Sequence, residues 1–199
     1  MLCWRRLCCD QSVQPAPVRK AVRCWVGPAR TDDLRSQRYV KKFPDMQDQH
    51  TATLLDYYTR HQASAQWRGF LTALAEEFET QLGTAQLRQL MARIGVKFAG
   101  SHPPGTCATL DELAAFFNTT WSSLDWGFVN LVERDEYLSI QHHCAPLAAF
   151  GAAADAWTPA FLEGAYQHWL GELGAGALVL RQVETGDHRT LEFRLAKTA

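Results

Sequence analysis

The adjacent side chains of His142, His143 and Cys144 form the cluster in this sequence best suited to a metal ion. The residues around them alternate like a β-strand, in which successive side chains point to opposite faces. The two histidines therefore cannot both face one ion unless the strand bulges or ends. We expect the end of a strand at the surface rather than a metal site, and no cofactor.

Cysteine chemistry is the second possibility. A thiol nucleophile needs a histidine beside it and a group that orients the histidine. Cys107 lies in a loop rich in proline and glycine, and Cys144 stands two residues before Pro146. Only the fold could place a histidine and an orienting group beside either cysteine, and we expect small, half-buried thiols instead.

Carboxylate pairs could serve a glycosidase. Glu76, Glu77 and Glu79 share one predicted helix, where they fit its solvated face. Glu163 lies in the first turn of another predicted helix, where the helix dipole favours an anion without any catalysis. The sequence has no Walker loop and no G-x-G-x-x-G, H-E-x-x-H or G-x-S-x-G motif, so these routes to phosphate binding or hydrolysis have no support.

Tryptophans offer a surface for a partner or a sugar. Aromatic side chains on the apolar stripe of a helix normally pack in the core. The spacing predicts this for Trp67, Trp121 and Trp169, whereas Trp126 and Trp157 fall at predicted turns. We therefore expect Trp126 and Trp157 to be the candidates for a partner surface.

The elements that must position these side chains lie after a break in composition. Residues 1–45 carry a net charge of +6 and four of the six cysteines, whereas residues 46–199 carry −7. We expect residues 1–45 to be a basic, poorly ordered extension, with Met46 as the true start, and residues 46–199 to form one domain.

Apolar spacing predicts helices over 64–82, 84–98, 109–124 and 158–170, with a short helical turn at 54–58. Ser64 and Thr84 suit helix starts, Gly83 suits a helix end, and Thr109 with Glu112 forms a capping box. Alternation predicts strands over 128–133, 137–143, 177–184 and 189–195, the last two joined by a turn at 185–187. The predicted fold class is α+β in a single domain, and residue chemistry alone indicates a non-catalytic assembly subunit.

Two motifs resemble a known family. The run Leu124–Val129, read L-D-W-G-F-V, resembles the I-N-W-G-Y-V signature of the D subunits of bacterial cellulose synthase, the cellulose synthase operon protein D family. The later run has Trp157, then Glu163-Gly164 after five residues, then Tyr166 and Trp169, and it matches the same family. Asp125 in place of an amide and a proline at position 159, one place early, are departures from the family pattern.

The resemblance implies a non-catalytic accessory subunit that forms dimers stacking into a ring-like octamer. It also implies a role in organising the export and crystalline bundling of nascent β-1,4-glucan. The implied partners are the membrane synthase, a proline-rich accessory protein and glucan chains, with no nucleic acid. The family-signature residues, with a structural or assembly role, are Trp126, Gly127, Trp157, Leu162, Glu163, Gly164, Tyr166 and Trp169. Because neither Met1 nor Met46 begins a secretion signal, we expect the cytoplasmic face of the inner membrane rather than the periplasm.

Two alternatives stay open at this point. A carbohydrate-active enzyme of the same pathway predicts a cleft with two carboxylates about 5–10 Å apart. Its candidates are Glu163, Asp125 and Glu133. A small-molecule sensor domain predicts a closed apolar cavity lined by Phe98, Phe116 and Trp121.

Overall fold

The computed structural model describes residues 51, 53–58, 61, 63–183 and 189–197. The chain divides into a unit formed by Asp10–Leu54 and a unit that contains Leu55–Ala199, and the fold below is that of the second unit. The predicted extension at 1–45, its boundary at Met46 and the predicted turn at 185–187 lie outside the described residues. In the part that is described, no helix combines the length and apolar character needed to cross a membrane.

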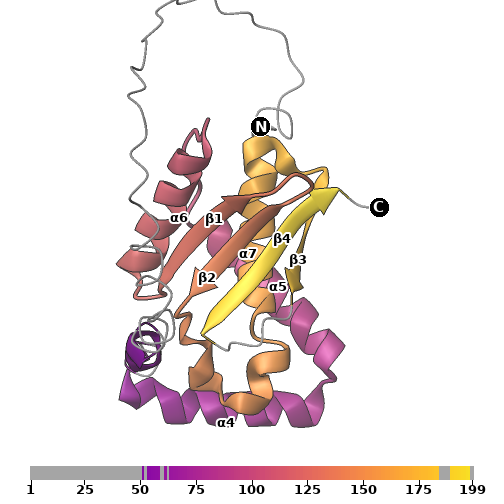
Figure 1. Ribbon diagram of the computed structural model, residues 1–199. Coiled ribbons are helices and arrows are strands. Elements are labelled where there is room, and N and C mark those ends of the chain that lie inside the picture. The colour runs from indigo at the N-terminus through magenta and orange to yellow at the C-terminus, as the bar shows by residue number, and fades with distance from the viewer. Residues whose placement is uncertain (1–50, 52, 59–60, 62, 184–188, 198–199) are drawn as a thin grey trace, which may run out of the picture. The chain divides into compact units, whose positions relative to one another are not determined.

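The described unit is an α+β domain, as predicted (Figure 1). Residues 53–58 are helical, as expected for the lead-in. The helices are α4 (Ala65–Gln81), α5 (Thr84–Gly100), α6 (Leu110–Ser123) and α7 (Ala160–Leu170). The strands are β1 (Phe128–Glu133), β2 (Leu138–His143), β3 (Leu178–Val183) and β4 (Thr190–Lys197). The segment expected to be a loop before α7 contains two 3₁₀ helices, η1 (Pro146–Phe150) and η2 (Ala152–Ala156), and a π-helical turn, η3 (Gly171–Ala175), follows α7.

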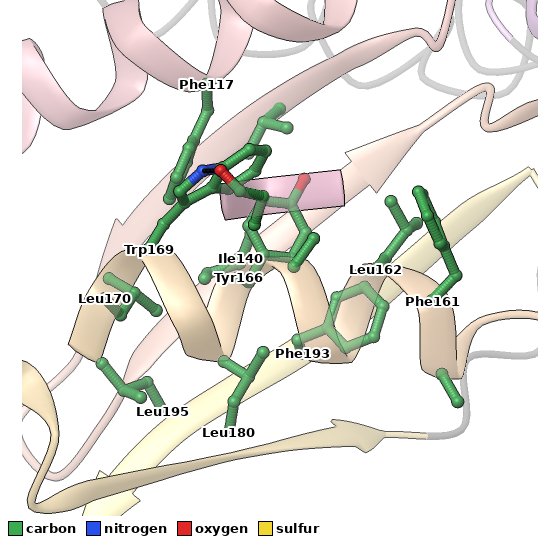
Figure 2. Packing of buried hydrophobic residues seen from close by; sticks show 14 of the residues in the cluster. Phe117, Ile140, Phe161, Leu162, Tyr166, Trp169, Leu170, Leu180, Phe193 and Leu195 are labelled. Atoms are coloured by element: carbon green, nitrogen blue, oxygen red, sulfur yellow. Dashed lines mark hydrogen bonds between the residues drawn. The ribbon is translucent and has the colours of Figure 1, made fainter. Parts of the chain in front are cut away.

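The four strands form one antiparallel sheet in the order β1-β2-β4-β3. The central pairing joins β2 to β4, so that Ile140 lies opposite Phe193. One face of the sheet contributes buried side chains to the core, where the Tyr166 ring of α7 lies 5.8 Å from the Phe193 ring of β4. Figure 2 shows Trp169 of α7 extending toward Phe117 of α6. Burial of this many large side chains supplies the main stabilising free energy of the domain.

On each edge strand of the sheet, a side-chain amide binds two backbone groups. On β1, Asn118 of α6 donates from Nδ2 to the Val129 carbonyl at 2.9 Å and accepts from the Val129 N–H at 2.7 Å. On β3, Gln167 of α7 donates to the Leu178 carbonyl at 3.0 Å and accepts from the Leu180 N–H at 2.7 Å. Each amide takes backbone groups that would otherwise pair with a further strand, which opposes edge-to-edge association.

The helix starts confirm some local predictions and correct others. Thr109 accepts from the Glu112 N–H at 3.2 Å, and Glu112 accepts from the Thr109 N–H, so the capping box is confirmed. Ser64 occupies the cap position of α4, but its side chain makes no capping bond. Gly83 caps the start of α5 instead of ending α4. The Thr158 hydroxyl, at the predicted start of the helix 158–170, donates to the Ala154 carbonyl at 2.9 Å, and α7 begins two residues later.

Candidate functional site

The signature turn after α6 is built around Trp126 and Gly127. The Trp126 ring lies 5.6 Å from the Trp121 ring and 4.9 Å from the Phe161 ring, centroid to centroid. Gly127 has a φ of +87°, and a Cβ there would come within 1.9 Å of the His143 carbonyl oxygen. Only glycine fits this close approach, so the turn locks α6 against the end of β2.

The signature glycine of α7 lets two helices meet backbone to backbone. A Cβ on Gly164 would lie 2.1 Å from the Ala92 carbonyl oxygen on α5. Gly95 of α5 makes the reciprocal contact, since a Cβ there would lie 2.0 Å from the Phe161 carbonyl oxygen. Beside this crossing, Glu163 accepts from Arg88 of α5 at 2.8 Å, with both side chains partly exposed. Helix α7 is thus fixed to α5 by shape and by one ion pair.

The remaining signature residues are buried and anchor other segments to α7. Trp157 is 2 % exposed, and its indole N–H donates to Glu79 of α4 at 2.8 Å. Trp169 donates to the His102 carbonyl at 2.8 Å, and Leu162 lies in the core. These positions join α4, α5 and the loop after α5 to one central helix.

His142 forms a buried polar link with Tyr166, contrary to the predicted surface position. Its ring has no exposed area, with Nε2 2.7 Å from the Trp126 carbonyl oxygen and Nδ1 2.6 Å from the Tyr166 hydroxyl. Because a carbonyl only accepts, Nε2 donates and the neutral Nδ1 accepts from Tyr166. Burial lowers the pKa of His142 from 6.5 to about 4 and raises the pKa of the Tyr166 hydroxyl well above its ordinary value.

His143 points away from His142, as the strand argument requires. Its Nδ1 lies 3.0 Å from the Thr190 hydroxyl, and its ring stacks on Phe128 at 4.7 Å. Cys144 is buried, with its sulfur 3.8 Å from the Leu55 carbonyl oxygen. Across the described residues, no group of three His, Cys, Asp or Glu side chains is placed to hold a metal ion.

The tryptophan prediction is wrong for Trp157 and Trp67 and right for Trp121 and Trp169. Trp157 is buried and offers no free surface, whereas Trp126 is half-buried among aromatic rings and its role at a partner surface stays a prediction. Trp121 and Trp169 are fully buried, as predicted. Trp67, which the spacing assigns to the core, is 55 % exposed on α4.

Helix α4 therefore presents aromatic side chains to solvent. Trp67 and Phe70 are 55 % and 57 % exposed and contact each other edge-on with centroids 5.9 Å apart. The opposite side of the helix is held by η1, where the Thr72 hydroxyl lies 3.2 Å from the Ala149 carbonyl oxygen, and by the buried Ala75. Apolar spacing identified the helix correctly, but part of its apolar face is not covered by the described chain. Exposed apolar side chains that contact each other on a surface make this face a candidate interaction site.

The cavity expected for a sensor domain is filled by rings. Phe98 stacks on Trp121 at 5.4 Å, and Phe116 meets Trp169 edge-on at 5.3 Å. Trp121 also contacts Trp169 at 5.4 Å. These aromatic contacts make a packed core in the place where the sensor hypothesis required a space.

An open hollow of about 400 Å³ lies beside the signature turn. Its lining includes Tyr58, Ser122, Asp125, Phe128 and Cys144. Asp125 has a left-handed φ of +56°, which asparagine and aspartate tolerate best among residues with a Cβ. The family amide at this position and the aspartate found here therefore suit the same turn. Of the carboxylates proposed for an enzyme, Asp125 lines this hollow and Glu163 is held by Arg88.

The fold and the site define an α+β protein whose signature residues fix its own helices and whose helix α4 displays an aromatic face that the described residues leave uncovered. A family model described as the D subunit of cellulose synthase matches residues 53–196, and the chain belongs to this family. The family places the protein in bacterial cellulose synthesis as an accessory subunit and not as the catalytic one. None of the curated proteins matches the chain in a sequence search.

Proposed function

We propose that the protein is a scaffold subunit of the cellulose synthesis and secretion complex. Copies of the chain form dimers that stack into a ring-like octamer at the cytoplasmic face of the inner membrane. The ring contacts the membrane synthase and a proline-rich accessory protein, and it holds synthases at a fixed spacing. Nascent β-1,4-glucan chains then emerge side by side and bundle into crystals, because a repeated weak contact acts through its multiplicity.

The observation that carries this proposal is the aromatic face of α4. Trp67 and Phe70 are each more than half exposed on a helix whose other side contacts the domain through Thr72 and the buried Ala75. Covering apolar surface releases about 25 cal/mol per Å², so a second protein surface on this face gains free energy. The amides on the two edge strands occupy backbone groups that a further strand would need, which favours association through a helical face over strand pairing.

Light scattering of the purified full chain tests self-association. We expect a multi-copy particle for the wild type and a smaller one for the double variant Trp67→Gln/Phe70→Gln. Leu124→Gln is the matched control, since Leu124 is also exposed but lies at the end of α6. A wild-type protein that stays a monomer at all concentrations would refute the scaffold proposal.

The cellular test uses the assembly-defective variant in a cellulose-producing strain. We expect glucan synthesis to continue while X-ray diffraction of the product loses crystalline order. Normally bundled cellulose from cells that carry only the dissociated variant contradicts the role in bundling. Cleavage of a cello-oligosaccharide by the purified protein would instead support the carbohydrate-active enzyme.

A further inference from the structure

Helices α4 and α5 each carry an apolar strip that ends in a charged residue, and the two charges have opposite sign. Residues three, four or seven positions apart lie on one face of a helix. Both strips occupy positions i, i+4 and i+7 and consist of Phe70, Leu74 and Glu77 on α4 and of Leu90, Ile94 and Lys97 on α5. The two faces therefore have the same pattern of size and polarity with complementary charge.

Both strips are open to solvent in the described unit. Phe70 is 57 % and Ile94 43 % exposed, while Leu74 and Leu90 are half-buried. The buried side of α5 is a different one, since its fully buried residues are Leu87, Met91, Gly95 and Ala99. Each strip is thus available beside the surface that its helix uses within the domain.

The charges that flank the strips are not used within the described fold. Arg93 lies three residues after Leu90, so α5 places two cations, Arg93 and Lys97, along its strip. The ion pairs formed among the described residues involve neither these cations nor Glu77. The Glu77 carboxylate accepts a hydrogen bond from Gln81 of its own helix at 3.1 Å.

We infer that the α4 strip of one copy docks on the α5 strip of a second copy, with Glu77 of the first facing Lys97 of the second. Pairing α4 with α4 would leave the cations of α5 unused. Pairing α5 with α5 would bring Arg93 and Lys97 against a second set of cations, which is unfavourable. Only the unlike pairing covers both apolar strips and neutralises both charged borders.

This contact rests on the proposed self-association and adds its geometry. Because the two strips lie on different helices, every copy can bind one neighbour through its α4 strip and another neighbour through its α5 strip. Such a heterologous contact closes into a ring when the rotation between copies allows it. The same pairing also permits a two-fold dimer in which each α4 contacts the other copy's α5.

Charge reversal in the full-length protein tests the pairing. We expect Glu77→Lys and Lys97→Glu, each alone, to raise the dissociation constant of the assembly about tenfold, because attraction becomes repulsion at each contact. The double variant Glu77→Lys/Lys97→Glu restores the constant to within about twofold of the wild type. Glu136→Lys between β1 and β2 is the control for the change in net charge.

Mixing the two single variants separates contacts between copies from contacts within one chain. In the mixture, each reversed side chain can meet its opposite charge on the other variant, so light scattering should show recovery of the assembled mass. This interface is wrong if the single reversals behave like Glu136→Lys, or if neither the double variant nor the mixture recovers the assembled mass. In either case, a wild-type protein that is still multimeric leaves the scaffold proposal standing. If the basic segment 1–45 covers α4 instead, Glu77→Lys lowers thermal stability without changing the mass, and the inference is wrong.

Discussion

Protonation of His142 should make the folded state lose stability in mild acid. The imidazole has a pKa of about 4 in the folded chain and about 6.5 when exposed by unfolding. Between these values the unfolded chain binds the proton and the folded chain does not, so the free energy of unfolding falls as the pH drops below 6.5. The stabilisation is fully present above pH 6.5 and fully lost below pH 4.

The size of this effect follows from the two pKa values. A difference of about 2.5 units corresponds to about 3 kcal/mol at full protonation, and about 2 kcal/mol is already lost at pH 5. Urea unfolding followed by tryptophan fluorescence at pH 8, 6.5 and 5 measures this loss. His142→Gln removes the titrating group, so its pH dependence should be shallower by about one proton between pH 6.5 and 4.

The wild type must be compared with His142→Gln because carboxylates also titrate in acid. Their contribution is common to the wild type and to His142→Gln and cancels in the difference. Nitrogen NMR of the wild type at pH 7 should show His142 with its proton on Nε2, since that atom donates to the Trp126 carbonyl. Equal pH slopes for both proteins, or a ring that is cationic at pH 6, would refute the buried neutral link.

Two further predictions concern the contacts of α7. Gly164→Ala should lower the free energy of unfolding, measured with urea, by about 3 kcal/mol, because the new Cβ has no room against the Ala92 carbonyl. Gly69→Ala on α4 is the control, since a Cβ there meets nothing within 4 Å. It should leave the free energy of unfolding unchanged or raise it by up to about 1 kcal/mol. Trp157→Phe should speed hydrogen exchange of the α4 amides by removing the N–H that donates to Glu79, and Glu79→Gln, which keeps an acceptor, should not.

Helix caps and strand bounds could be predicted from the sequence because they depend on residues only a few positions apart. The capping box needs only Thr109 and Glu112, three residues apart, and it forms as predicted. Strand β1 begins and ends where alternation placed it. The pairing of β2 with β4 joins residues about fifty positions apart, and no local pattern encodes which strands become neighbours.

The tryptophans show why burial is harder to predict than helicity. Periodicity states which face of a helix is apolar, but it does not state what covers that face. Trp67 lies on such a face and is exposed. Trp157 falls at a predicted turn and is buried, with its ring 6.1 Å from the Phe150 ring of η1 and its N–H bonded to Glu79 of α4. Alternation places His142 near a strand end, but its Tyr166 partner comes from α7, twenty-four residues away.

The proposed ring requires a fixed angle between the two exposed strips, and the signature residues lie where they can fix it. A ring of identical copies closes only if the angle between its two contact faces is fixed, since an error in that angle accumulates from copy to copy. A linker of two residues, Leu82 and Gly83, joins α4 to α5. Trp157 ties α4 to the start of α7 through Glu79, and the glycine contact at Gly164 ties α7 to α5. In the proposed assembly, these contacts inside the domain would hold the two outer strips at a fixed angle to each other.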